Sequence, residues 1–153
     1  MLPLLLAPAF LQMLAMSFDE LHYHRARGLP RWERIGHPLD TVSAAVCYGW
    51  LVLMRPSAPH ALGIYLALTT FSCLFITKDE SVHAAYCEPG EQWLHSLLFV
   101  LHPVVFAGFG FIWWLGLAPW VLELELALTL GFGVYQVLYW SVSWPRISAK
   151  RSR

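Results

Sequence analysis

Charged residues are scarce in this sequence and balanced in sign. Only 13% of the 153 residues are Asp, Glu, Lys or Arg, and ten basic residues stand against ten acidic ones. Because there is no basic excess to attract phosphate, we expect no nucleic-acid partner. Three cysteines, two of them inside apolar runs (Cys47 and Cys73), do not indicate a disulfide scaffold. A hydrophobic content of 58% and a mean hydropathy of +0.53 argue against a water-soluble enzyme.

Apolar runs fill most of the chain. Each run approaches the roughly 20 residues that a helix needs to cross a bilayer. We therefore predict an all-α integral membrane protein with about five transmembrane helices in a single domain, 1–153. No basic stretch precedes the first run, and Asp19 and Glu20 follow it, so this run is predicted to be a retained helix rather than a signal peptide. The five runs are 2–18, 39–54, 58–77, 93–117 and 120–144.

The basic residues predict an orientation in the membrane. With five spans, nine of the ten Lys and Arg residues fall on one side and only Arg55 falls on the other. Basic residues accumulate in cytoplasmic connections, so the N-terminus is predicted outside and the basic tail, 145–153, in the cytoplasm. We expect the protein to lie in the lipid bilayer of a bacterial inner membrane.

Acidic residues and histidines gather around two connections, which the orientation puts on the cytoplasmic face. Both connections begin with an Asp-Glu pair (19–20 and 79–80) and end with Glu-x-x-x-His (33–37 and 91–95). This similarity predicts a duplicated two-helix unit, 1–55 and 58–117, whose two copies form a four-helix bundle. The segment 119–144 is then an additional helix.

The spacing within the clusters indicates metal binding. Residues three or four apart share one face of a helix, so each of four helices can direct a carboxylate and an imidazole inward. A surface salt bridge would explain a single pair, whereas two pairs at matched positions favour a metal site. Mixed carboxylate and imidazole ligands suit iron best here, with zinc or manganese possible, and their number favours two ions. The predicted ligands are Glu20, His24, Glu33, His37, Glu80, His83, Glu91 and His95.

This arrangement of ligands is similar to that of ferritin-like di-iron proteins, in which two helices give Glu and two give Glu-x-x-His. Only Glu80 to His83 has that spacing here; Glu33 to His37 and Glu91 to His95 are one residue longer. The His-x-x-His-His boxes of membrane desaturases and hydroxylases are absent from the sequence. The resemblance is thus limited to the ligand pattern.

Further polar residues are expected to orient the ligands or to replace some of them. His102 lies seven residues beyond His95, on about the same helix face but deeper in the membrane, where an ionisable residue suggests function. The residues in this class are Asp19, His22, Asp40, Asp79 and His102.

These expectations favour a metal-dependent membrane enzyme that oxidises a hydrophobic or lipid substrate by hydroxylation, desaturation or quinol oxidation, with a cytoplasmic electron donor. A zinc-dependent hydrolase or transferase acting on a lipid would use the same ligands. A metal transporter would need polar residues through the whole bilayer, and a haem protein would need paired histidines in mid-membrane. Beyond the two clusters, only His102 is a candidate polar residue deeper in the membrane, so the sequence favours neither of these two functions.

Overall fold

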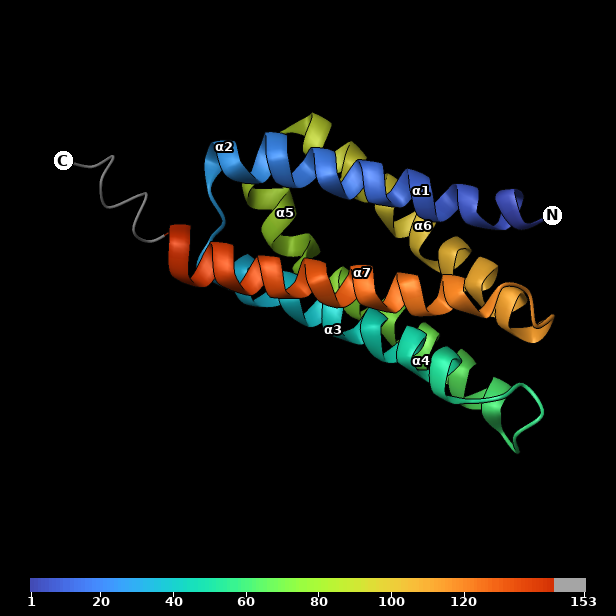
Figure 1. Cartoon of the computed structure of the whole chain (residues 1–153). Helices are drawn as coiled ribbons and strands as arrows, with labels where there is room; N and C mark the ends of the chain where they lie inside the picture. The colour runs from blue at the N-terminus through green and yellow to red at the C-terminus, as the bar shows by residue number, and fades with distance from the viewer. Residues whose placement is uncertain (145–153) are drawn as a thin grey trace.

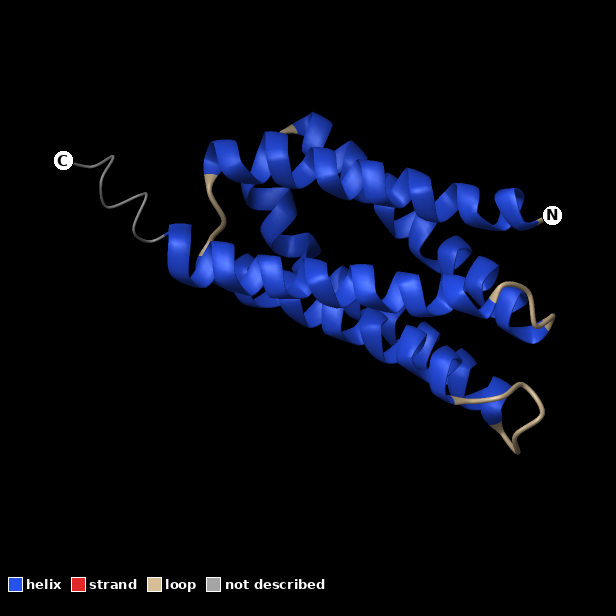
Figure 2. Cartoon of the chain, viewed as in Figure 1, coloured by secondary structure: helices blue, strands red, loops and turns tan. Residues whose placement is uncertain are grey.

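A computed structural model describes residues 1–144, except for the side chain of Asp79. This part of the chain consists of helices joined by short loops and contains no strand (Figure 2). The all-helical fold predicted from the sequence is therefore confirmed. The basic tail predicted at 145–153 lies outside the described residues.

The first half of the chain forms two long helical segments. α1 (Leu2–Phe18) continues through a π-helical turn, η1 (Asp19–His24), into the short α2 (Arg25–Arg27). Gly28 ends this segment with a φ of +76°, a conformation that favours glycine. α3 (Arg31–Leu53) runs back towards the other end of the molecule.

The second half has a similar order of elements and one more helix. α4 (Ala61–Phe75) leads through the 3₁₀ turn η2 (Ile76–Asp79) into α5 (Glu80–Tyr86). α6 (Pro89–Trp114) and α7 (Pro119–Leu138) each begin with proline, which needs no hydrogen-bond partner in a first helical turn. A second π-helical turn, η3 (Tyr139–Ser143), follows α7.

Four helical segments are long and apolar enough to cross a membrane. α3 is also long, at 23 residues, but its first three turns carry Arg31, Glu33, Arg34 and Asp40. The chain is thus compatible with a membrane, as its composition predicts. The four segments are Leu2–Arg27, Ala61–Tyr86, Pro89–Trp114 and Pro119–Ser143.

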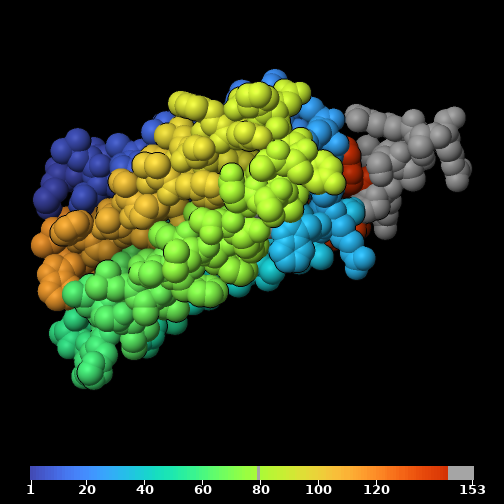
Figure 3. Space-filling model, turned by 180° about the vertical axis from the view of Figure 1, so that it is seen from behind, coloured from blue at the N-terminus to red at the C-terminus, as the bar shows by residue number. Residues whose placement is uncertain are grey.

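The helices pack lengthwise into a bundle (Figure 1). α1 lies along α6, and α3 contacts both α4 and α7. Seen from behind, α4 and α6 lie side by side (Figure 3), in agreement with their contacts. A Cβ atom on Gly108 of α6 would lie 2.7 Å from the carbonyl oxygen of Leu5, so the glycine permits this close approach of α1.

The centre of the bundle is apolar, and so is much of its outer surface. Phe109, Ile112 and Leu51 are almost fully buried, whereas Phe111 and Val100 are among many large apolar side chains exposed on the outside. Lipid chains would cover such a surface in a membrane. The connections 54–60 and 115–118 lie at the same end as Met1, and the connections 28–30 and 87–88 lie at the opposite end (Figure 1).

α7, predicted as an additional helix, is an integral part of the bundle. It packs along α3, where the hydroxyl of Thr41 donates a 2.7 Å hydrogen bond to the side-chain oxygen of Gln136. Its last turns reach the end of the bundle at which the polar residues collect. α7 therefore helps to build the candidate site.

Candidate metal centre

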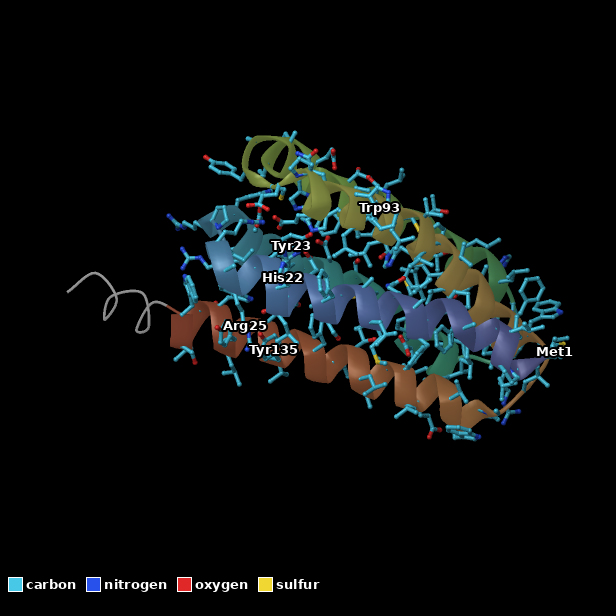
Figure 4. The ribbon with its side chains drawn as sticks, turned by 90° about the horizontal axis from the view of Figure 1, so that it is seen from above. Met1, His22, Tyr23, Arg25, Trp93 and Tyr135 are labelled. Atoms are coloured by element: carbon cyan, nitrogen blue, oxygen red, sulfur yellow. The ribbon has the colours of Figure 1, made fainter. Side chains whose placement is uncertain are left out.

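The two polar clusters of the sequence meet in space, at the end of the bundle remote from Met1. Figure 4 shows His22, Tyr23, Arg25 and Tyr135 at this end, with Met1 at the other. The cluster combines residues from η1, α3, α5 and α6. Its buried titratable side chains, all at most 5% exposed, are Asp19, Glu20, His24, Glu33, His83, Glu91 and His95.

Four of these residues, which we call the inner group, have donor atoms close enough to share one ion. The group consists of Asp19, His24, Glu91 and His95, with one donor atom from each within 4.8 Å of the others. Asp19 Oδ2 lies 3.1 Å from Nε2 of His24 and 3.1 Å from Nε2 of His95. Two donors bound to the same ion at about 2.0–2.2 Å are separated by about 3 to 3.5 Å. The inner group could therefore hold a metal ion.

The π-helical turn brings Asp19 into this group. Asp19 and His24 are five residues apart, and hydrogen bonds in a π-helix run between residues i and i+5. The wider turn places both side chains on the same face, so that the carboxylate meets the imidazole. An α-helical period predicts Glu20 rather than Asp19 as the nearest acidic partner of His24.

A second group of three residues adjoins the first. His24, Glu33 and His37 also have donor atoms within 4.8 Å of one another, so the two groups share His24. Glu33 Oε1 and His37 Nε2 are buried and have no hydrogen-bond partner. Buried polar atoms without a partner are rare and indicate an ion or a water at that place.

Glu20 lies behind His24 and holds its imidazole. Glu20 Oε2 is 3.2 Å from His24 Nδ1, while Glu20 Oε1 accepts hydrogen bonds from the Tyr135 hydroxyl (2.6 Å) and the Trp140 indole (3.0 Å). A carboxylate on the second nitrogen of a ligating histidine fixes its orientation and raises its basicity. The sequence did not reveal Tyr135 and Trp140, because aromatic residues near the end of a span look the same as a membrane-interface belt.

His83 holds the other inner imidazole. Its Nδ1 lies 3.1 Å from Nδ1 of His95, and the two ring centroids are 4.2 Å apart. Because one of these nitrogens donates to the other, the remaining nitrogen of His95, Nε2, is directed towards Asp19. Both inner imidazoles are thus fixed through the nitrogen that does not face the inner group.

Arg27 is the second feature that the sequence did not reveal. Its Nη2 lies 2.8 Å from Glu33 Oε2 and 2.8 Å from Glu91 Oε1, and so joins the two matched glutamates. As a basic residue in a connection, Arg27 is indistinguishable in the sequence from a cytoplasmic membrane anchor.

The buried cluster holds more negative than positive charge. Four buried carboxylates (Asp19, Glu20, Glu33 and Glu91) stand against the single guanidinium of Arg27, a difference of three charges when the histidines are neutral. Burying unbalanced charge costs several kcal/mol per ion, so about three carboxylates in excess favour the uptake of a cation or of protons. A divalent metal ion or protonated histidines would supply this positive charge.

The other predicted residues whose side chains are described lie outside this arrangement. Glu80 is exposed, and His22 is exposed and stacks on Phe18. Asp40 is 2.6 Å from Lys78 Nζ. His102 lies deeper in the bundle, with Nε2 3.1 Å from the Ser72 hydroxyl. The side chain of Asp79 is outside the described part of the chain.

Cys87 lies near the cluster and carries a free thiol. Its sulfur accepts a contact from Arg27 Nη2 at 3.5 Å. Partial burial raises the pKa of Cys87 to about 12, so the group stays protonated at neutral pH. Neither donor group includes a cysteine, so the candidate ligands in these groups are nitrogen and oxygen atoms.

A cavity of about 270 Å³ opens beside His83 and His95. His83 and His95 form its inner wall, and Gln92 and Trp93 of α6 lie at its side. Trp93 is largely exposed at the surface of the bundle (Figure 4). The cavity therefore offers a path from the surface of α5 and α6 to the inner group.

The chain matches no protein-family model, no curated protein and no solved structure. Its function is therefore inferred from the site itself.

Proposed function

We propose that the protein is an integral membrane enzyme whose metal ion is bound by Asp19, His24, Glu91 and His95. The observation that carries this proposal is the spacing of the four donor atoms inside a buried, negatively charged cluster. Glu20 and His83 support it, because each holds the second nitrogen of an inner imidazole. A network of ion pairs alone would not require the second nitrogen of each imidazole to be held in this way.

Two nitrogen and two oxygen donors favour iron, with manganese and zinc as further possibilities. The sequence favours two ions, whereas the structure supports a single ion, because both groups depend on His24. Nδ1 of His24 is held by Glu20, so only Nε2 is left for a metal. We therefore assign the first ion to the inner group.

We infer an oxidation of a hydrophobic substrate as the reaction. Bound iron would supply redox chemistry with dioxygen. The chain itself holds the ligands rigidly, surrounds them with buried side chains and leaves the cavity beside His83 and His95 as the approach for a substrate. We infer a lipid-soluble compound that is hydroxylated, desaturated or oxidised as a quinol; Trp93 is the large apolar side chain of a cavity that is otherwise lined mostly by polar residues.

We place the cluster at the cytoplasmic face of a bacterial inner membrane. The end of the bundle with the cluster carries most of the basic residues, and Arg55 lies in the connection at the other end. This orientation requires α3 to cross as a fifth span and puts the N-terminus outside. A cytoplasmic electron donor would then reach the site. The described basic residues at the cluster end are Arg25, Arg27, Arg31, Arg34 and Lys78.

The two halves of the bundle are also compatible with the duplicated unit. If α1 corresponds to α4 and α3 to α6, the contact of α1 with α6 has its counterpart in the contact of α4 with α3. The duplication remains a prediction of the sequence, supported by this exchange of partners.

A zinc-dependent lipid hydrolase is the second candidate function. Four donors around one ion match the tetrahedral coordination of zinc, and the free Oε1 of Glu33 is a candidate general base. Elemental analysis together with a visible spectrum distinguishes the two functions, since zinc gives no visible absorption.

The test is elemental analysis of the detergent-purified protein, with a visible spectrum of the same sample. We expect about one iron ion per chain. Glu91→Gln should lose the ion, whereas Glu123→Gln, an exposed glutamate at the other end of the bundle, should retain it. Zinc in place of iron would support the hydrolase, and a protein without metal after reconstitution would refute both functions.

A further inference from the structure

The guanidinium of Arg27 occupies the space between two carboxylates from different helices. Its Nη2 is 2.8 Å from Glu33 Oε2 on α3 and 2.8 Å from Glu91 Oε1 on α6, and its Nε is 3.1 and 3.3 Å from the two oxygens of Glu91. Both glutamates are at most 1% exposed. A single cationic nitrogen thus bridges two fully buried carboxylates.

Bridging of this kind is also what a second metal ion does in carboxylate-rich helical bundles. A divalent ion that replaced Arg27 beside Glu33 would need further donors, and the second donor group supplies candidates. Glu33 Oε1 and His37 Nε2 are buried without a hydrogen-bond partner, and both residues belong to the second donor group. An ordinary ion pair with Arg27 uses Glu33 Oε2 and leaves these two atoms unexplained.

We propose that Arg27 takes the place of a second divalent cation in this protein. The inner group then holds one ion, and Arg27 supplies the positive charge between Glu33 and Glu91. When the guanidinium is removed, Glu33 is released and, together with His37 of the second donor group, becomes open to a second ion. The inference rests on the proposed function, because it takes the first ion as bound.

The charge balance gives the same result. Arg27 contributes one positive charge to a cluster with four buried carboxylates. Without it the two glutamates face each other with nothing between them, and repulsion between buried like charges favours uptake of a cation. An uncharged side chain at position 27 should therefore raise the number of ions bound.

The experiment compares Arg27→Gln with the full-length native protein, each purified without metal and then incubated with Mn²⁺. Elemental analysis should give about one manganese ion per native chain and about two per Arg27→Gln chain, a twofold increase. Arg31→Gln removes the same charge from the exposed start of α3 and should stay at the native value. A paramagnetic resonance spectrum provides a second measurement, because two neighbouring Mn²⁺ ions couple magnetically and one does not.

The results separate this inference from the proposed function. A native protein with no bound ion refutes both, whereas two ions in the native protein refute only the role of Arg27. One ion in both the native chain and a folded Arg27→Gln chain refutes it as well. If Arg27→Gln does not fold, Glu33→Gln is the second test. In the native protein Glu33 pairs with Arg27 and does not bind the first ion, so Glu33→Gln should keep one ion per chain. Loss of that ion from Glu33→Gln would overturn the inference.

Discussion

Asp19 and His95, 76 residues apart in the sequence, meet with 3.1 Å between the carboxylate Oδ2 and the imidazole Nε2. The contact joins the π-helical turn after α1 to α6, so the inner group depends on the packing of these two helices. Its four donor atoms lie within 4.8 Å of one another and could share a single ion. Binding should therefore depend strongly on each of them.

Asp19→Asn should weaken metal binding by about 100-fold, because a neutral amide replaces the central carboxylate of the inner group. Competition with a chelator of known affinity would measure the change. Asp40→Asn is the matched control: it removes a carboxylate that pairs with Lys78, 2.6 Å away, and should leave the affinity unchanged. Equal losses in the two variants would contradict the assignment of Asp19.

Tyr135→Phe should weaken metal binding by about 10-fold, since the hydroxyl no longer holds Glu20 behind His24. Tyr139 is one turn further along, and Tyr139→Phe removes a hydroxyl that does not hold Glu20, so it should bind metal as the native protein does. The same chelator titration measures both variants. An unchanged affinity in Tyr135→Phe would show that Glu20 needs no support from α7.

The sequence predicts the helices well but not the identity of all site residues. Apolar runs reveal where the membrane-compatible helices lie, and the predictions of an all-helical chain and of helices long and apolar enough to cross a membrane are confirmed. Two of the runs begin several residues later than their helices, however: α3 starts at Arg31 and α6 at Pro89, because their polar first turns are also helical. Those turns carry Glu33 and Glu91, so the site lies on helices rather than in loops.

The site itself is predictable only where the chain keeps an α-helical period. Glu33 and His37 of α3 meet as their spacing of four residues predicts. Asp19 joins the inner group because of the π-helical turn, which no periodicity in the sequence reveals. Arg27 turns inward to Glu33, and residue counts for orientation cannot distinguish an inward arginine from one that faces lipid headgroups.

Phe109→Ala should destabilise the protein by about 3 to 5 kcal/mol, the usual cost of removing a buried aromatic side chain. Phe109 is 1% exposed in the centre of the bundle, whereas Phe111, two residues away on α6, is 58% exposed. Phe111→Ala should therefore change the free energy of unfolding by only about 0.5 kcal/mol. Unfolding titrations in mixed detergent micelles would measure the difference, and equal effects would contradict the helix packing.

The proposed orientation can be tested by labelling single cysteines in whole cells. Ser57 is exposed in the connection at the end near Met1, and Arg31 is exposed at the end with the cluster. With a membrane-impermeant maleimide, Ser57→Cys should be labelled in intact cells whose outer membrane is permeabilised, and Arg31→Cys only after lysis. The reverse pattern would place the cluster outside. The background carries alanine in place of Cys47, Cys73 and Cys87.

The π-helical turn at Asp19–His24 separates two requirements that a regular helix would couple. In an α-helix, the face of α1 that packs on α6 would also fix the direction of the carboxylates and imidazole at its end. One extra residue in the turn changes the rotation between these parts. Substitutions along α1 can then change its packing on α6, while the turn alone sets the direction in which the ligand side chains point. Deleting a residue from this turn would rotate the residues after it relative to α1. The ligand side chains would then no longer point towards the inner group while α1 stays packed on α6.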